Sequence, residues 1–559
     1  MDEQLPPVAP SPPPSPSFLQ RRSSRRALLI GTVTIAAGGT AAAVVGVAAQ
    51  SGDSGKKATI PGVPAGEAST PAAAASASAS APALASSAVV VSDARKRAAH
   101  LLRRAGFGGS AAEIDEFAKL DRATAVNRLV DFETVDNGKL DKLLAAANLT
   151  LRRTESGGGQ VIQDMQRWWL LRMAYTARPL EERMTFIWHG LLTSQVSKVG
   201  PQRAYWLVVQ NELFRKNALG KYDDLVQAVA KDPAMLTYLD TVDSTKEHAN
   251  ENFPRELMEL FTMGVGNYTE ADIRESARAF TGWRLSVPHL PKLPANATEA
   301  EKKKARDTLY ATYNPEFRFQ PRLHDEGPKT FLSQTGNWNG EDIIRIIMGQ
   351  PATARFVTAR LFSEFAYPGP EPAVIDRLVK TWDSSGHSTK EVVRAILMSD
   401  EFYSEKAYRA KVRGPIEVVA GAVRGLEMQT DYAMVSGGGG GRGGNVFYAG
   451  MDQVLFEPPN VAGWPGGPAW LSSSTFFARV NFLDQMFFSR GRPVALPALK
   501  NATTADALVD EIAARLVDGD MAATSRAAIT AHLNTIKDPA ERAATAAYLV
   551  AGSPEFQLI

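Results

Sequence analysis

Residues 250–264 read N-E-N-F-P-R-E-L-M-E-L-F-T-M-G, and this stretch predicts a helix with one apolar face and one charged edge. At about 100° per residue, four large apolar side chains fall on the same face of such a helix: Phe253, Leu257, Leu260 and Phe261. Pro254 fits the first helical turn, where its missing N–H costs nothing, and Gly264 fits the C-terminal stop. The stretch therefore predicts a helix that packs on a core.

Similar amphipathic helices follow one another from about residue 92 onward. Capping residues stand at four predicted helix starts: Ser92, Ser110 with Glu113, Thr269 with Asp272, and Ser388 with Glu391. Ala-rich segments near the end predict three more helices: 505–517, 524–536 and 538–552. Strand signals are sparse, and the clearest is Phe317-Arg318-Phe319. We therefore expect an all-α or nearly all-α fold, a multi-helix globular body with long irregular loops and at most a small β-hairpin.

The first ninety residues have the composition of a targeting signal and a linker. Ser24-Arg25-Arg26-Ala27-Leu28-Leu29 resembles the twin-arginine export signal, and an uncharged run up to Ala49 follows it. That run is also long enough to span a bilayer, so an N-terminal membrane helix is the alternative. Residues 50–90 contain mostly Ala, Ser, Pro and Gly, which predicts a disordered linker.

These signals divide the chain into four parts. Residues 1–49 form a twin-arginine-type export signal with a Pro-rich leader, and residues 50–90 form the linker. Residues 91–490 form the main helical domain, and residues 491–559 form a C-terminal helical segment packed on it. We expect export across the cytoplasmic membrane to the cell envelope or the extracellular space. Membrane contact is expected only through the N-terminal signal, if that signal stays uncleaved.

The composition and motifs of the chain argue against several kinds of partner and cofactor. With 62 Lys and Arg against 60 Asp and Glu, the net charge of +2 gives no electrostatic footprint for a nucleic acid. The absence of cysteine from the sequence excludes disulfides and Cys-ligated metal. No Gly-x-Gly-x-x-Gly follows a predicted strand, so a dinucleotide site has no support. The sequence names no other cofactor, and the identity of any metal stays unknown.

Two irregular stretches interrupt the helices. Residues 436–444 (S-G-G-G-G-G-R-G-G) lack the context of a phosphate-binding loop and predict a mobile surface loop. Residues 456–467 (F-E-P-P-N-V-A-G-W-P-G-G) are aromatic and rich in turn residues. Trp464 and Trp470 either anchor this second stretch to the core or line a cleft.

Several motifs occur in a fixed order along the chain: 101–108 (L-L-R-R-A-G-F-G), 183–189 (R-M-T-F-I-W-H), 250–264, 268–283 (Y-T through T-G-W), His324-Asp325 with Lys329, and 458–465 (P-P-N-V-A-G-W-P). Together they resemble the bacterial family known as domain of unknown function 1800. The resemblance implies an exported, largely helical protein and a second, sulfatase-like exported protein as a partner, and it brings no activity. The family often has Trp-His-x-His, whereas Leu191 takes the place of the second histidine here.

Five residues are candidates for acid–base catalysis or for binding a hard cation: Glu256, Glu259, His189, His324 and Asp325. Six more are candidates for lining a ligand pocket: Glu251, Asn252, Arg255, Trp283, Asn460 and Trp464. Glu256 borders the apolar face of its helix, where partial burial would perturb the pKa of its carboxyl group. The spacing of Arg255 and Glu259 predicts an ion pair within the helix. The same residues also fit a purely structural polar network, or a ligand cleft without turnover.

Two functions follow from these observations. The first is an exported binding or assembly protein that acts with a co-exported partner. The second is an exported hydrolase or metal-dependent enzyme that acts on an extracellular polymer through the Glu, His and Asp candidates. Convergence of His189, Glu256 and His324 around one pocket would favour the enzyme.

Overall fold

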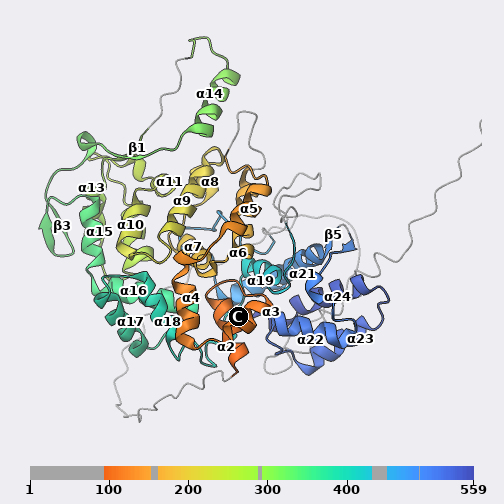
Figure 1. Ribbon diagram of the computed structural model, residues 1–559. Helices are drawn as coiled ribbons and strands as arrows, with labels where there is room; N and C mark the ends of the chain where they lie inside the picture. The colour runs from red at the N-terminus through yellow and green to blue at the C-terminus, as the bar shows by residue number, and fades with distance from the viewer. Residues whose placement is uncertain (1–92, 153–160, 287–292, 431–449, 490) are drawn as a thin grey trace, which may run out of the picture.

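Amphipathic helices build almost all of the structure, a computed structural model that describes residues 93–152, 161–286, 293–430, 450–489 and 491–559 (Figure 1). The nearly all-α prediction is confirmed. The predicted export signal at 1–49, the linker at 50–90 and the glycine loop at 436–444 lie outside the described residues. No helix in the described ranges has the length and apolar character needed to cross a bilayer.

The helices begin in the middle of the body, continue to the end that holds α13 and α15, and return through the middle to the end that holds α22 to α24 (Figure 1). The first half contains α2 (Ala94–Arg104), α3 (Ala111–Phe117), α4 (Arg122–Val130), α5 (Gly138–Ala146), α6 (Val161–Tyr175), α7 (Pro179–Leu191), α8 (Val196–Val199), α9 (Tyr205–Lys216), α10 (Tyr222–Ala230), α11 (Pro233–Tyr238), α12 (Asn252–Glu256) and α13 (Glu270–Ala279). The second half contains α14 (Glu299–Thr312), α15 (Gly340–Met348), α16 (Pro351–Phe365), α17 (Pro372–Ser384), α18 (Thr389–Met398), α19 (Pro415–Gly425), α21 (Ser473–Phe487), α22 (Ala505–Leu516), α23 (Ala523–Leu533) and α24 (Pro539–Ala551).

Polar side chains start the helices where the sequence predicts them. Ser110 and Thr269 form capping boxes at α3 and α13, and Ser388 caps α18. At α2 the capping side chain is Asp93, which accepts a hydrogen bond from Lys96 N, and the predicted cap Ser92 lies outside the described residues. The three predicted C-terminal helices correspond to α22, α23 and α24.

Strands occur in the described residues only as three antiparallel two-stranded pairs. Strand β1 (Trp283–Leu285) pairs with β2 (Phe317–Phe319), which is the strand that the sequence predicts. Strand β3 (Lys329–Phe331) pairs with β4 (Gln334–Gly336), and β5 (Phe488–Ser489) pairs with β6 (Arg492–Pro493). The first two pairs lie at the edge of the body next to α13, in the part of Figure 1 that also holds α15.

The stretch at 250–264 folds as α12 followed by a π-helical segment, Leu257–Thr262, which the sequence does not predict. Phe253, Leu257 and Phe261 are buried as expected. Gly264 ends the segment with a φ of +78°, and its N–H donates to Met258 O at 2.9 Å. A left-handed residue at this position favours glycine, so the predicted stop is confirmed.

A buried ion pair joins the first helices to the middle of the chain. Arg183 of α7 contacts Glu417 of α19 at 2.5 Å, and its Nε donates to Gly106 O at 2.8 Å. Both side chains are nearly inaccessible to solvent. Gly106 belongs to the 101–108 motif, so this motif and the 183–189 motif meet at one guanidinium group.

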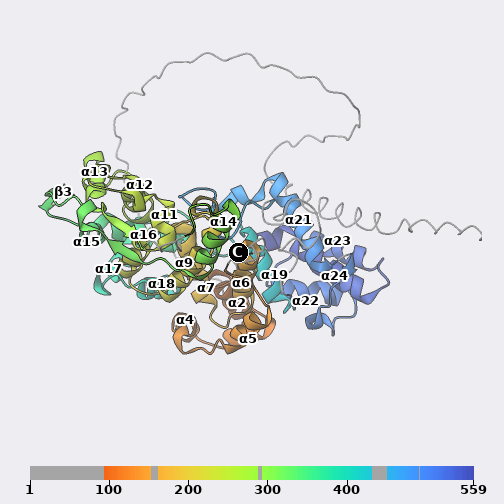
Figure 2. The ribbon, with the colours of Figure 1, turned by 90° about the horizontal axis from the view of Figure 1, so that it is seen from above.

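The C-terminal helices pack on the rest of the body through charged and main-chain contacts. Arg103 of α2 donates to both carboxylate oxygens of Asp518, each at 2.6 Å. The main chain of residues 557–559 pairs with that of residues 411–413, as in the bond from Arg413 N to Gln557 O at 2.7 Å. Seen from above, α22 to α24 lie at one end of the body and α13 and α15 at the other (Figure 2).

We expect Glu417→Gln to lower the free energy of unfolding by about 3–5 kcal/mol, because the substitution leaves the Arg183 guanidinium buried without its counter-ion. Urea unfolding followed by circular dichroism measures the change. Glu316→Gln is the matched control, because Glu316 pairs with Arg318 at the surface and should contribute about 0–1 kcal/mol. Equal small effects of the two substitutions would contradict a central role for the buried pair.

Candidate functional site

His189 lies in the core rather than in an open site. The side chain is 1% exposed, and the rings of Trp169, Phe214, Phe456 and Trp464 surround it at centroid distances of 5.2–6.3 Å. The closest of these contacts are Trp169 at 5.2 Å and Trp464 at 5.3 Å. Among the described residues the His189 Nε2 atom has no hydrogen-bond partner, and burial lowers the pKa of the ring to about 3. The ring is therefore neutral and inaccessible.

The loop that contains Trp464 closes over this histidine. The Trp464 ring stacks on Phe186 at 5.6 Å with an interplanar angle of 20°. Gly463 lies against α7, since a Cβ at this position would come within 2.2 Å of Gly190 O. Asn460 is exposed, and its side chain accepts a hydrogen bond from Ala462 N within the loop. Of the two roles left open by the sequence, Trp464 therefore has that of an anchor, and Asn460 shapes the turn.

The charged residues of α12 find other partners than the spacing predicts. Arg255 donates to both oxygens of Glu270 at 2.9 Å and to Glu251 at 3.2 Å. The predicted Arg255–Glu259 pair is wrong, because Glu259 instead accepts a hydrogen bond from the Tyr268 hydroxyl at 2.9 Å. These ion pairs tie α12 to the start of α13.

Asn252 makes a different contact at the N-terminus of α12. Its Nδ2 atom donates to Asp240 at 3.3 Å, and the same carboxylate accepts from Lys198 Nζ at 2.9 Å. Asp240 itself has a left-handed backbone, with φ of 57°. Asn252 therefore connects α12 to the end of α11 and to α8, and it remains exposed to solvent.

Glu256 is half-buried, and burial raises the pKa of its carboxyl group, with the neighbouring Glu259 adding to the shift and Arg255 opposing it. Burial also raises the pKa of Tyr238 to about 12, and the charges of Glu256 and Glu457 contribute to that shift. Glu457 accepts from Gln195 Nε2 at 3.1 Å. Glu256 and Glu457 thus form an acidic patch near Tyr238, with Glu259 next to Glu256 and Glu457 supplied by the 456–467 loop.

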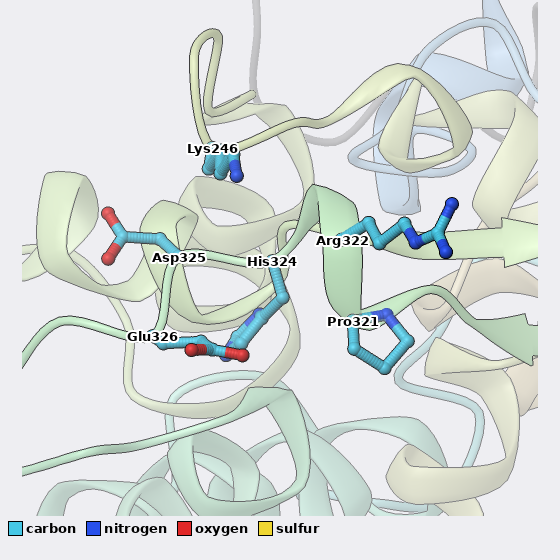
Figure 3. A pocket seen from close by; sticks show the side chains of 6 residues that line it. All are labelled: Lys246, Pro321, Arg322, His324, Asp325 and Glu326. Atoms are coloured by element: carbon cyan, nitrogen blue, oxygen red, sulfur yellow. The ribbon is translucent and has the colours of Figure 1, made fainter.

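A separate pocket of about 520 Å³ opens between the 244–252 loop and residues 321–326 (Figure 3). Six residues line it: Lys246, Pro321, Arg322, His324, Asp325 and Glu326. The loop is held there by two main-chain hydrogen bonds, from Lys246 N to Leu323 O at 2.8 Å and from Gly282 N to Ser244 O at 3.1 Å. This pocket contains the predicted pair His324 and Asp325.

The positions of His324 and Asp325 in the pocket are fixed by hydrogen bonds. His324 Nδ1 donates to Thr281 O at 2.9 Å. Arg278 donates to both oxygens of Asp325, at 2.7 and 3.1 Å, and this guanidinium holds the pKa of the carboxyl group below its usual value. Lys329, the third residue of that motif, donates from Nζ to Asp325 O at 2.6 Å and to Gly327 O at 3.0 Å. In Figure 3 the Asp325 carboxylate points away from His324.

The candidates do not meet at one centre. His189 contacts aromatic rings of the core, Glu256 faces Tyr238, and His324 lines the separate pocket. In the ranges that the structure describes, no three His, Asp or Glu side chains are grouped so as to hold a metal ion. Trp283 is fully buried between Phe280 and Phe317, which makes it a core residue rather than a pocket wall.

Six residues of these two sites were not singled out from the sequence: Tyr238, Glu457, Lys246, Pro321, Arg322 and Glu326. Glu457 stands inside the 456–467 stretch, and Arg322 and Glu326 flank the His324-Asp325 motif. Their proximity to a motif could therefore have identified these three as site residues. Tyr238 and Lys246 carry no such signal, because only the fold brings them to these positions.

Comparison with known proteins gives one match. The family model described as "Protein of unknown function (DUF1800)" matches residues 100–558, and it therefore extends through the C-terminal helices. No curated protein and no solved structure matches the chain.

We expect the neutral His189 to make stability depend on pH. The unfolded pKa is near 6.5 and the folded pKa is about 3, so the contribution is complete above pH 6.5 and falls as the pH drops toward 3. At pH 5 the loss should be about 2 kcal/mol, from about 1.4 kcal/mol per pKa unit. His189→Phe should remove this loss, measured as the difference from wild type in urea unfolding at pH 7.5 and pH 5.

Comparing the two chains at each pH cancels the titration of all other groups, including Asp232, whose pKa burial raises to about 7. His248→Gln is the control, because His248 is exposed and should leave the pH dependence unchanged. An unchanged pH dependence in His189→Phe would show that the ring is not neutral and buried in solution.

Proposed function

This chain belongs to the DUF1800 family of proteins of unknown function, and we propose that it is an exported binding protein that takes its ligand into the pocket around His324. The observation that carries the proposal is the contrast between fixed and free groups in that pocket. His324 and Asp325 are held by Thr281 and Arg278, whereas the side chains of Lys246, Arg322 and Glu326 make no ion pair within the described residues.

This contrast favours binding over turnover. An acid or base in catalysis must exchange a proton with the substrate, but the Asp325 carboxylate is neutralised by a bidentate arginine and points away from His324. A preformed wall with a few free polar groups is typical of a ligand site. The pocket therefore supports recognition of a ligand without requiring chemistry.

Export and a partner are further parts of the proposal. The motif at 24–29 and the apolar run up to Ala49 support export by a twin-arginine route. The family resemblance supports a co-exported, sulfatase-like partner, with which the body would act at the cell envelope as an assembly or binding component. Affinity purification of the full chain from the envelope fraction, compared with a chain that is not exported, tests the partner.

We expect at least one small molecule to stabilise the full chain through the pocket, by about 2–3 kcal/mol at a concentration near 100 times its Kd. A thermal-shift screen against sugars, sugar acids, amino acids and nucleotides identifies it. Lys246→Gln should remove the stabilisation, whereas Lys302→Gln should retain it, because Lys302 is an exposed lysine paired with Glu299 on α14. A screen with no ligand that depends on Lys246 would contradict the binding function.

A second candidate function rests on the acidic patch. The raised pKa of the Glu256 carboxyl group and its position beside Tyr238 and Glu457 are suited to general acid catalysis, as in an exported hydrolase or metal-dependent enzyme acting on a polymer. Hydrolysis of envelope glycans or sulfated sugars by the purified protein, reduced about 100-fold or more in Glu256→Gln at unchanged Tm, would establish the enzyme and replace the binding proposal.

We expect the pair of substitutions Arg25→Lys and Arg26→Lys to stop export, because the twin-arginine route reads the two guanidinium groups. Fractionation of the producing cells, followed by immunoblotting, measures the share of full chain that reaches the envelope or the medium. Arg21→Lys with Arg22→Lys is the matched control, since these residues precede the motif. Equal export of both variants would exclude this route.

A further inference from the structure

Two cations flank the pocket, and neither has a charged partner in the part of the chain that the structure describes. Lys246 extends from the 244–252 loop, and Arg322 extends from the turn at Pro321–Leu323. Among the described residues neither side chain forms an ion pair, although Lys246 is fixed at its main chain by Leu323 O. Figure 3 shows the two side chains on different sides of His324. Two free cations around one space favour a ligand that carries an anionic group, and the planar guanidinium suits a carboxylate or a sulfate.

Hydrogen-bond acceptors lie beside these cations. Because the proton on His324 Nδ1 is donated to the Thr281 carbonyl, Nε2 is the ring nitrogen left to accept a hydrogen bond from a ligand. The Glu326 side chain also lines the pocket and makes no hydrogen bond to another described residue. A simple inorganic anion would offer these two acceptors nothing. Hydroxyl groups on the ligand would donate to both of them.

An exposed aromatic ring stands next to His324. Phe319 of β2 is 44% exposed, and its ring contacts the His324 ring edge-on at a centroid distance of 5.2 Å. Large apolar side chains at this exposure are few in the described part of the chain. An open ring beside polar groups provides an apolar surface for a ligand that has both C–H and hydroxyl faces.

We propose that the ligand is a saccharide unit with one anionic group, a carboxylate or a sulfate. Lys246 and Arg322 supply the positive charge that attracts the anionic group, one from each side of His324, while His324 Nε2 and Glu326 accept from the hydroxyls and Phe319 contacts the C–H face of the ring. The volume of about 520 Å³ is in the range of small-molecule sites. This inference rests on the proposed binding function and names the class of ligand for that same pocket.

Isothermal titration calorimetry on the full chain tests the inference with D-glucuronate, glucose 6-sulfate, glucose, acetate and inorganic sulfate, all at one ionic strength. We expect one or both acidic sugars to bind at least about tenfold more tightly than glucose, acetate or sulfate. The first two probes distinguish a carboxylate from a sulfate ester. Glucose tests whether binding needs the anionic group, and acetate and inorganic sulfate test whether it needs the hydroxyl groups.

Substitutions assign the binding to this pocket. Arg322→Gln and Lys246→Gln should each weaken the acidic sugar about tenfold, and Phe319→Ser should weaken it together with its uncharged analogue. Arg318→Gln and Phe477→Ser are the matched controls, because Arg318 is an exposed arginine paired with Glu316 and Phe477 is a 50% exposed phenylalanine on α21. Both controls should bind like wild type.

The outcomes separate the two proposals. If neither acidic sugar binds but another ligand from the thermal-shift screen stabilises the chain in a Lys246-dependent way, the saccharide inference is wrong and the binding function stands. If acidic sugars and bare anions bind equally, the pocket recognises charge alone and the inference is overturned. If no ligand depends on Lys246 or Arg322, both proposals fall.

Discussion

The buried pair of Arg183 and Glu417 is the constraint on which the arrangement of the helices depends. Burying two charges is costly, and the cost is recovered only when the geometry satisfies their remaining hydrogen bonds. Arg183 meets this condition by donating to Gly106 O as well as to Glu417, and the Glu417 carboxylate also accepts from Gly414 N. The start of the body, α7 and α19 are therefore held in one register, and displacement of any of them would leave a buried charge unpaired.

The orientation of α7 in turn positions the candidate sites. The same helix presents Gly190, against which Gly463 packs so closely that a side chain would collide with the carbonyl oxygen. This contact brings the 456–467 loop onto the start of α8 and the residues before it, where Val196 N donates to Phe456 O at 3.0 Å and Thr193 Oγ1 donates to Val461 O at 2.6 Å. Glu457 consequently lies close enough to Tyr238 to raise the pKa of that hydroxyl together with Glu256. The acidic patch is thus a product of loop docking, and its carboxylates come from segments about 200 residues apart in the chain.

Local chemistry made the helices predictable, whereas contacts between helices did not follow from spacing. The capping boxes at Ser110 and Thr269 form between residues three positions apart, so both partners can be recognised in a short stretch of sequence. Arg255 shows the opposite case, because the i,i+4 rule considers only neighbours on one helix, and the preferred partner Glu270 lies on the next helix. The π-helical segment after α12 could not be predicted from the sequence either, because its i,i+5 geometry depends on how the apolar face packs on the core.

The site residues that could be predicted are those whose side-chain type alone suggests catalysis or binding. His324 and Glu256 were found from their types and positions, but Lys246 enters the pocket only because the 244–252 loop folds onto residues 320–323. His189 is a catalytic candidate by sequence but lies among aromatic core residues in the structure. The sequence does not distinguish the two cases, because a histidine after a tryptophan can be a ligand or a core residue. Position 191, where the family often has a second histidine, is about 200° away around α7. A histidine there would point to the other side of the helix from His189, so the two positions do not face one common site in this chain.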